Sequence, residues 1–127
     1  MNKLKQRPVN LDLIHIRLPV MGIVSILHRI SGLLLIILLP YGVFLFDLSL
    51  TNEQGFLQVR DLLASIPAKI LLTFVIWLLS HHVCAGIRFL LIDIELGVSK
   101  QSARTGAWAV HLATLTLTLL LVVVLLL

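Results

Sequence analysis

Three long apolar runs constrain this sequence more than any other feature. They cover about residues 20–46, 67–92 and 105–127. A membrane-spanning helix needs roughly 20 predominantly apolar residues, and each run is long enough. Irregular backbone is not tolerated in contact with lipid, and no strand pattern competes with the helical interpretation. The sequence therefore predicts an all-α fold with three transmembrane helices, forming a single membrane domain over residues 1–127.

The composition indicates the same class of protein. Hydrophobic residues make up 59% of the chain and charged residues 13%, whereas a soluble domain is about half apolar and a quarter charged. The single cysteine, Cys84, lies inside the second run and cannot form an internal disulfide. The first residues lack the small-residue cleavage site of a signal peptide. We therefore expect an uncleaved start, as in a multi-pass protein of the bacterial inner membrane.

The net charge of +4 predicts an orientation in the bilayer rather than a nucleic-acid partner. Ten basic residues are present, and most fall at the ends of the runs on one side. Arg60 and Lys69 fall on the opposite side. The basic residues of the first side are Lys3, Lys5, Arg7, Arg17, Arg29, Arg88, Lys100 and Arg104. Because cytoplasmic flanks carry the excess of Lys and Arg, the N-terminus is predicted to be cytoplasmic and the C-terminus external.

The segments between the runs are short. Residues 1–19 are expected to form a cytoplasmic segment, and residues 93–104 an internal loop. The external connection, DLSLTNEQGFLQVRD, has room for a short helix at the membrane surface. Pro40 is expected to kink the outer end of the first helix. Pro67 lies near the start of the second, where proline is tolerated.

Polar residues in the first run recur at helical spacing. Ser25, His28, Arg29 and Gly32 follow the pattern i, i+3, i+4, i+7, which places them on one helix face. A charged residue inside a span costs about 3 kcal/mol on insertion scales, so this face is expected to point at a partner or ligand. The alternative is that Arg29 extends to the headgroups and Ser25 bonds its own helix backbone.

The second run carries His82 on a face with Ala85, Gly86, Phe89 and Asp93. At ~1.5 Å per residue, His82 lies roughly 15 Å from the cytoplasmic end of its helix, near the middle of the bilayer. Gly86, one turn away, leaves room for a flat group. An imidazole at this depth is able to bind haem iron, although a buried histidine taken alone is more often a hydrogen-bonded packing residue. The residues alone leave both interpretations open.

Depth also relates the two helices. Ser25 and Arg29 lie roughly 8 and 13 Å inside the first helix, in the same half of the bilayer as His82. They are able to supply hydrogen bonds to a quinone carbonyl, and His28 and Arg29 are able to meet haem propionates. His81 points about 100° away from His82, so the two cannot serve one site. His111 is the second-choice ligand, and we favour interhelical packing for it. The hydroxyls of Thr114 and Thr118 are expected to bond across helices or to their own backbone.

Two segments resemble the signatures of the cytochrome b556 subunits of bacterial succinate dehydrogenases. The first is RPVNLDL…IRLPVMGIVSILHRISG, and the second is HHVCAGIRFLLID. The resemblance implies one of two small anchor subunits of complex II. These hold the flavoprotein and iron–sulfur subunits at the membrane, share one haem b and form part of the ubiquinone site. The chain itself shows no flavin motif and no cysteine cluster, so it is not expected to be catalytic alone.

The resemblance also implies residue roles. His82 matches the axial ligand of the haem iron, with the other ligand supplied by the second anchor subunit. Ser25 and Arg29 match the quinone-site residues, and His28 and Arg29 match the residues that contact the propionates. Phe89 departs from the family, which often has histidine at this position, so one polar contact to the haem is missing. A role for Asp93 near the quinone is implied only by its place in the motif.

Two alternatives remain at the level of sequence. A fumarate reductase anchor would run the same chemistry in reverse, although two haems in one chain would need four well-placed histidines. A haem-free structural anchor or small transporter is the other alternative. Transporters usually carry acidic residues inside their spans, whereas all the acidic residues here lie in loops or at span edges. These are Asp12, Asp47, Glu53, Asp61, Asp93 and Glu95.

Overall fold

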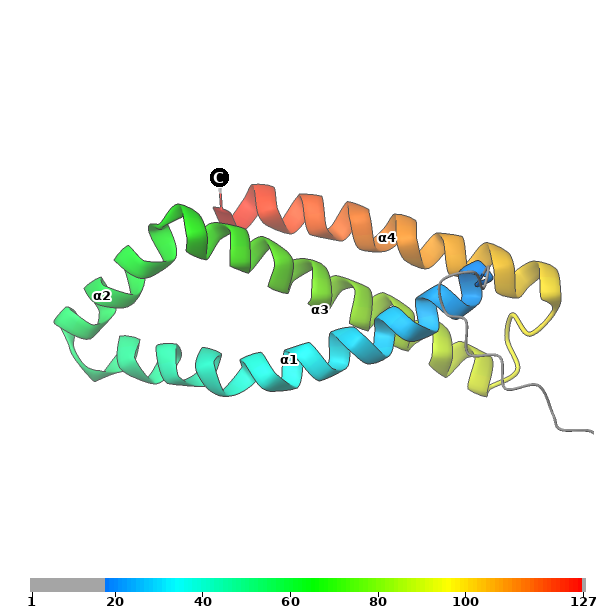
Figure 1. Cartoon of the computed structure of the whole chain (residues 1–127), viewed down its shortest axis with the longest axis horizontal. Coiled ribbons are helices and arrows are strands. Elements are labelled where there is room, and N and C mark those ends of the chain that lie inside the picture. The colour runs from blue at the N-terminus through cyan, green and yellow to red at the C-terminus, as the bar shows by residue number, and fades with distance from the viewer. Residues whose placement is uncertain (1–17, 127) are drawn as a thin grey trace, which may run out of the picture.

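The computed structural model describes residues 18–126, and within this range every regular element is a helix (Figure 1). The elements are α1 (Val20–Thr51), α2 (Glu53–Ala64), α3 (Ile66–Asp93) and α4 (Lys100–Leu126). Three of them, α1, α3 and α4, are long and apolar enough to cross a membrane. The expected all-α fold with three spans is confirmed. The predicted orientation of the N-terminus remains a prediction.

All three long helices extend beyond the apolar runs that predicted them. Helix α1 continues through Pro40 and past residue 46, and the hydroxyls of Ser49 and Thr51 donate hydrogen bonds to carbonyls one turn back. Helix α4 starts at Lys100 rather than 105. There the hydroxyl of Ser99 accepts a hydrogen bond from the backbone N–H of Ser102, as an N-cap does. Polar side chains that bond the local backbone allow each helix to continue outside its apolar stretch.

The external connection is itself the short helix α2. The Asn52 side chain accepts a hydrogen bond from the N–H of Gly55 at 2.8 Å, which caps the start of α2. Gly55 lies against the backbone carbonyl of Leu48, where a Cβ atom would collide. Ser65 then separates α2 from α3, and Pro67 occupies the first turn of α3, as expected. Helix α2 thus reverses the chain between two antiparallel spans.

Helix α3 is central, with α1 and α4 packed against it. A small core of Val24, Ala85, Ala107 and Val110 forms where the three long helices meet, at the right-hand end in Figure 1. Small residues let helices approach closely where no water drives them together. The turn from α3 to α4 uses positive φ angles at Glu95 and Gly97 (63° and 79°).

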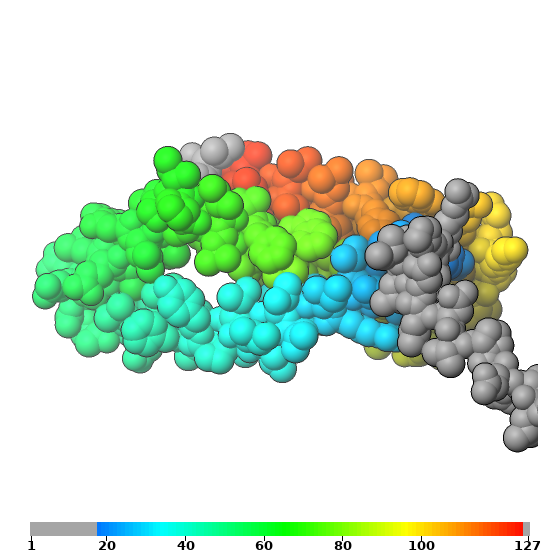
Figure 2. All heavy atoms as spheres, viewed as in Figure 1, coloured from blue at the N-terminus to red at the C-terminus, as the bar shows by residue number. Residues whose placement is uncertain are grey.

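Away from this core, α1 and α3 separate. Figure 2 shows a hollow between α1 and the start of α3, near α2. It corresponds to an apolar cavity of about 350 Å³, whose lining includes Leu38, Tyr41, Gly42 and Val75. Most large apolar side chains on the outer faces of the long helices are exposed, as suits contact with lipid or with other membrane subunits. The bundle is therefore tight at one end and open at the other.

Candidate functional site

The interface between α1 and α3 holds His82 by one edge of its ring. Nδ1 of His82 lies 3.2 Å from the hydroxyl of Ser31 and 3.2 Å from the backbone carbonyl of His28. The Ser31 hydroxyl also donates a hydrogen bond of 2.9 Å to that carbonyl. Among the described residues, every hydrogen-bond contact of His82 uses Nδ1. The second ring nitrogen, Nε2, is therefore left available.

Gly32 provides the space that the His82 ring occupies. A Cβ atom at this position would lie 2.8 Å from Cε1 of His82, closer than real contacts allow. Any larger side chain would push the ring away from α1. The sequence placed Gly86 beside the imidazole, but Gly86 faces His28, with a hypothetical Cβ 3.5 Å from its Nε2. The glycine that makes room for His82 comes from the opposite helix.

His28 stacks directly on His82. The two ring centroids are 4.2 Å apart, and the planes differ by 11°. The Phe89 ring lies 5.2 Å from His28 at a tilt of 60°. The three side chains thus form a connected group across α1 and α3. This places the departure from the family pattern, Phe89, in contact with the residue expected on the propionate side.

His82 also lines an apolar cavity of about 480 Å³ between α1 and α3. Gly32 and Leu79 border the same space. Leu38, Gly42 and Val75 line both this cavity and the one near α2, so the two lie next to each other along the helices. The imidazole is half-buried. An apolar cavity with one nitrogen available is the kind of site in which a flat apolar cofactor binds.

His81 faces the opposite direction, towards α4. It is fully buried, with its ring stacked between Trp77 and His111 at centroid distances of 5.8 Å on either side. Its Nδ1 lies 3.5 Å from the hydroxyl of Thr114, and within the described range its Nε2 has no hydrogen-bond partner. Neighbouring rings occupy the space around this imidazole. His81 and His82 therefore make different sets of contacts.

The four residues predicted to share one face of the first helix do not all face the same neighbour in the structure. His28 and Gly32 face α3, Ser25 is half-buried, and Arg29 is exposed. Because a residue turns about 100° from its neighbour, α1 presents His28 to α3 and Arg29 to the bundle surface. Asp93, at the end of α3, is also exposed. The structure brings His28 and His82 together but does not bring Arg29 or Asp93 to them.

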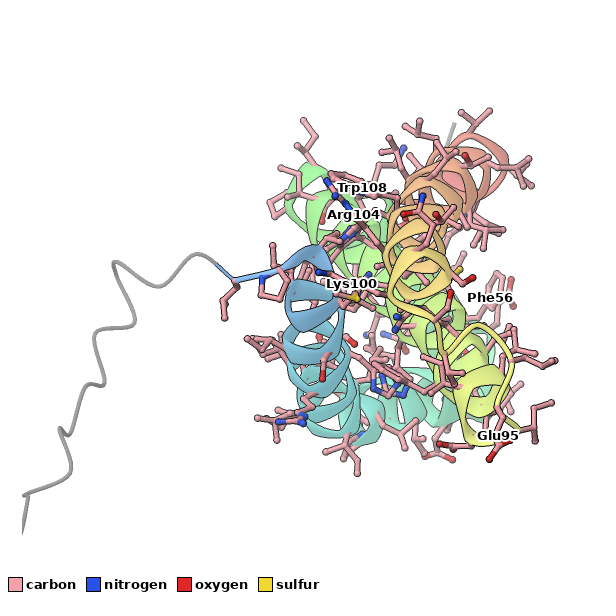
Figure 3. All side chains as sticks on the ribbon, turned by 90° about the vertical axis from the view of Figure 1, so that its right-hand side faces the viewer. Phe56, Glu95, Lys100, Arg104 and Trp108 are labelled. Atoms are coloured by element: carbon pink, nitrogen blue, oxygen red, sulfur yellow. The ribbon has the colours of Figure 1, made fainter. Side chains whose placement is uncertain are left out.

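The second-choice ligand, His111, lines a different cavity, of about 470 Å³, between the starts of α1 and α4. Lys100, Arg104 and Trp108 line it too, and Figure 3 shows these three side chains on successive turns of α4. The carbonyl of Ala103, on the same helix, accepts a 3.1 Å hydrogen bond from Nη2 of Arg88. This end of the interface is basic and distinct from the His82 cavity.

Ser31 is a site residue that the sequence pattern does not reveal. It is 1% exposed, contacts His82 directly and lies three residues after His28. The i, i+3 spacing from His28 and the position beside Gly32 were the only signals available. Neither reveals which residue of the second helix lies opposite, because helical periodicity does not define the register between two helices.

These residues fit a single-ligand haem site. Metal-bound histidines usually bond a carbonyl through the nitrogen that does not bind metal, as His82 bonds the carbonyl of His28. The described residues contain no group of three or more His, Cys, Asp or Glu side chains able to enclose a metal ion. A single imidazole held in this way is able to bind a porphyrin iron through Nε2.

The fold and this site define a class: a multi-pass helical membrane protein with one imidazole presented beside an intramembrane cavity. The family profile described as "Succinate dehydrogenase/Fumarate reductase transmembrane subunit" matches residues 3–121. The chain therefore belongs to this family, which confirms the resemblance of its two motifs.

Similar proteins include three named "Succinate dehydrogenase cytochrome b556 subunit". The one from Coxiella burnetii is 32% identical over 110 residues, covering 86% of this chain and 88% of the relative. The one from Rickettsia bellii is 30% identical over 126 residues, covering 95% and 98%. The one from Paracoccus denitrificans is 28% identical over 118 residues, covering 93% and 91%. The likeness extends over nearly the full length of both partners in each comparison.

Proposed function

We propose that this chain is a membrane-anchoring cytochrome b subunit of succinate dehydrogenase. In this role it binds haem b and forms part of the site where ubiquinone is reduced. The observation that carries the proposal is the setting of His82, whose Nδ1 is bonded to α1 while its Nε2 is left available beside an apolar cavity. Family membership and the names of the relatives support the same assignment.

In this proposal, Nε2 of His82 would bind the haem iron, and the second anchor subunit would supply a further ligand. When bound, the haem provides one-electron redox chemistry. His28 and Arg29 bind the propionates. His28 is suited to this role because its ring lies against that of His82, and Arg29 because its guanidinium carries a permanent charge and five donors. Phe89, beside His28, supplies only apolar contact.

Ser25 and Arg29 form this chain's share of the quinone site. The Ser25 hydroxyl donates a hydrogen bond to a quinone carbonyl. Arg29 stabilises the negative charge that develops as the quinone is reduced, as a preorganised donor does. Arg29 is exposed on the bundle surface. Because an exposed charge inside a span is costly, this position suits an interface with a quinone and another subunit better than contact with lipid alone.

Succinate oxidation takes place in partner subunits under this proposal. A flavoprotein and an iron–sulfur subunit bind at the cytoplasmic side of the bacterial inner membrane, where the N-terminus of this chain lies. Electrons reach ubiquinone at the junction of the iron–sulfur subunit and the cytoplasmic ends of the helices. This chain positions the quinone and anchors the complex, and it is not catalytic alone.

The test compares two assays on purified four-subunit complexes carrying Ser25→Ala or Arg29→Leu. We expect each substitution to lower succinate-driven ubiquinone reduction by about 10-fold or more, since one preorganised donor is worth 10²–10³ in rate. Succinate oxidation by a soluble dye should stay near wild type. Ser49→Ala and Arg60→Leu are matched controls, because Ser49 is half-buried like Ser25, Arg60 is exposed like Arg29, and both lie towards the other end of the bundle.

Equal loss in both assays would contradict the quinone role, because it would mean that Ser25 and Arg29 support assembly. A wild-type ubiquinone rate in both variants would contradict it as well. A wild-type complex without a b-type band in its reduced-minus-oxidised spectrum would instead contradict haem binding and leave the chain as a haem-free anchor.

A further inference from the structure

The contacts around Nδ1 of His82 determine which ring nitrogen carries the proton. The carbonyl of His28, 3.2 Å away, is only an acceptor, so Nδ1 must be the donor in that contact. The Ser31 hydroxyl gives its own proton to the same carbonyl at 2.9 Å and turns a lone pair towards Nδ1 at 3.2 Å. Both contacts therefore require a proton on Nδ1, and the neutral ring then carries its lone pair on Nε2.

We propose that Ser31 is a positioning residue for His82. Its hydroxyl holds the imidazole in the Nδ1–H tautomer and in the plane that presents Nε2 to a haem iron. This inference rests on the proposed function, in which His82 is the axial ligand. It concerns a residue that touches neither haem nor quinone in that scheme and acts through the ring that it holds.

The position of Ser31 indicates a role beyond a hydrogen bond within its own helix. A serine that bonds the carbonyl three residues back is common in membrane helices and needs no partner elsewhere. Ser31, however, is 1% exposed and contacts a ring nitrogen 51 positions away in sequence. Gly32, the next residue, leaves the space into which that ring fits. Adjacent residues of α1 thus provide the hydrogen bond and the space that together determine the position of His82.

The hydrogen bond also has an electronic consequence. Acceptors on the distal N–H of a ligating histidine raise the basicity of the nitrogen that binds the metal. A more basic ligand stabilises oxidised iron and so lowers the midpoint potential. Removal of the Ser31 oxygen leaves the His28 carbonyl as the sole acceptor, so we expect the midpoint potential to become more positive. Loss of such outer contacts also weakens metal binding, typically by about 10-fold or more.

The experiment uses the complete complex with Ser31→Ala, Ser31→Thr and Thr114→Val. The readouts are haem content per flavin, the midpoint potential from a redox titration of the b-type band, and the electron paramagnetic resonance spectrum of the oxidised haem. We expect Ser31→Ala to raise the ratio of reduced to oxidised haem at a fixed potential by about threefold, because one hydrogen bond to the ligand ring is lost. Ser31→Thr keeps the hydroxyl and should keep wild-type values. Thr114→Val removes the hydroxyl beside His81 and should also leave them unchanged.

A midpoint potential and resonance spectrum of Ser31→Ala identical to wild type would overturn the inference. So would an equal shift in Ser31→Thr, because volume rather than the hydroxyl would then be responsible. Loss of haem from Ser31→Ala but not from Ser31→Thr would support it. If Ser31→Ala fails to assemble, Ser31→Cys, with a similar size and a weaker acceptor, replaces it with the same expected shift. Haem retained unchanged in His82→Leu would contradict the proposed function instead.

Discussion

Two adjacent histidines on α3 occupy two different interfaces. His82 is half-buried at the contact with α1, bonded through Nδ1 and next to a cavity of about 480 Å³. His81 is fully buried between α3 and α4, with neighbouring rings at 5.8 Å on two sides. The His82 ring borders an open cavity, whereas the His81 ring is enclosed by neighbouring side chains. Both rings have an Nε2 without a hydrogen-bond partner among the described residues, so the difference between them is the cavity beside His82.

Among the substitutions that test this difference, Gly32→Ala is expected to have the largest effect, which is on haem retention. The added Cβ would lie 2.8 Å from Cε1 of His82, so the ring must move. We expect about 10-fold weaker haem retention or more, measured as haem per flavin in the purified complex. Gly42→Ala is the matched control, because a Cβ there meets nothing within 4 Å although the residue lines the same cavity. Equal haem loss in both variants would show that the close approach of Gly32 is irrelevant.

Substitutions of His81 test the interface between α3 and α4, and their expected effect on stability is of intermediate size. His81→Ala should leave a void between Trp77 and His111 and destabilise the protein by about 2–4 kcal/mol. His81→Phe keeps a ring in the stack and should recover most of that loss. Both variants should keep the wild-type haem spectrum. Thermal unfolding in detergent, followed beside the b-type band, checks this. A His81→Ala protein as stable as wild type would contradict the packing role.

The smallest expected effect is that of Thr114→Val. The hydroxyl lies 3.5 Å from Nδ1 of His81, which is long for a hydrogen bond, so little stability depends on it. Valine keeps the shape of the side chain and the lost contact is long, so we expect the free energy of unfolding to fall by about 1 kcal/mol or less. The same thermal measurement checks it. A larger loss would show that His81 is held by hydrogen bonding as well as by packing.

Much of the fold could be predicted because it depends on run length. Three apolar runs indicated three spans, and the angular separation of His81 and His82 indicated that the two cannot serve one site. The helix ends were less predictable, since Ser49, Thr51 and Ser99 extend or cap helices through local hydrogen bonds outside the apolar runs. Residues 1–17, including the expected cytoplasmic segment up to Arg17, lie outside the described range.

The site was predicted only in part, for a geometric reason. Periodicity indicates which residues share a face of one helix, but not the register against a second helix. The stripe on α1 therefore included Gly32 without indicating that it faces His82, and it omitted Ser31. It also grouped Arg29 with His28, although only His28 turns towards α3. Pairing across helices depends on side-chain packing, which a single sequence does not specify.

The most direct test of the account is a dithionite-reduced minus oxidised visible spectrum of the complex with His82→Leu, beside the same complex with His81→Leu. We expect the b-type band to be lost in His82→Leu and kept in His81→Leu, with flavin content unchanged in both. A band that survives in His82→Leu and disappears in His81→Leu would contradict it, because the packed histidine would then be the ligand.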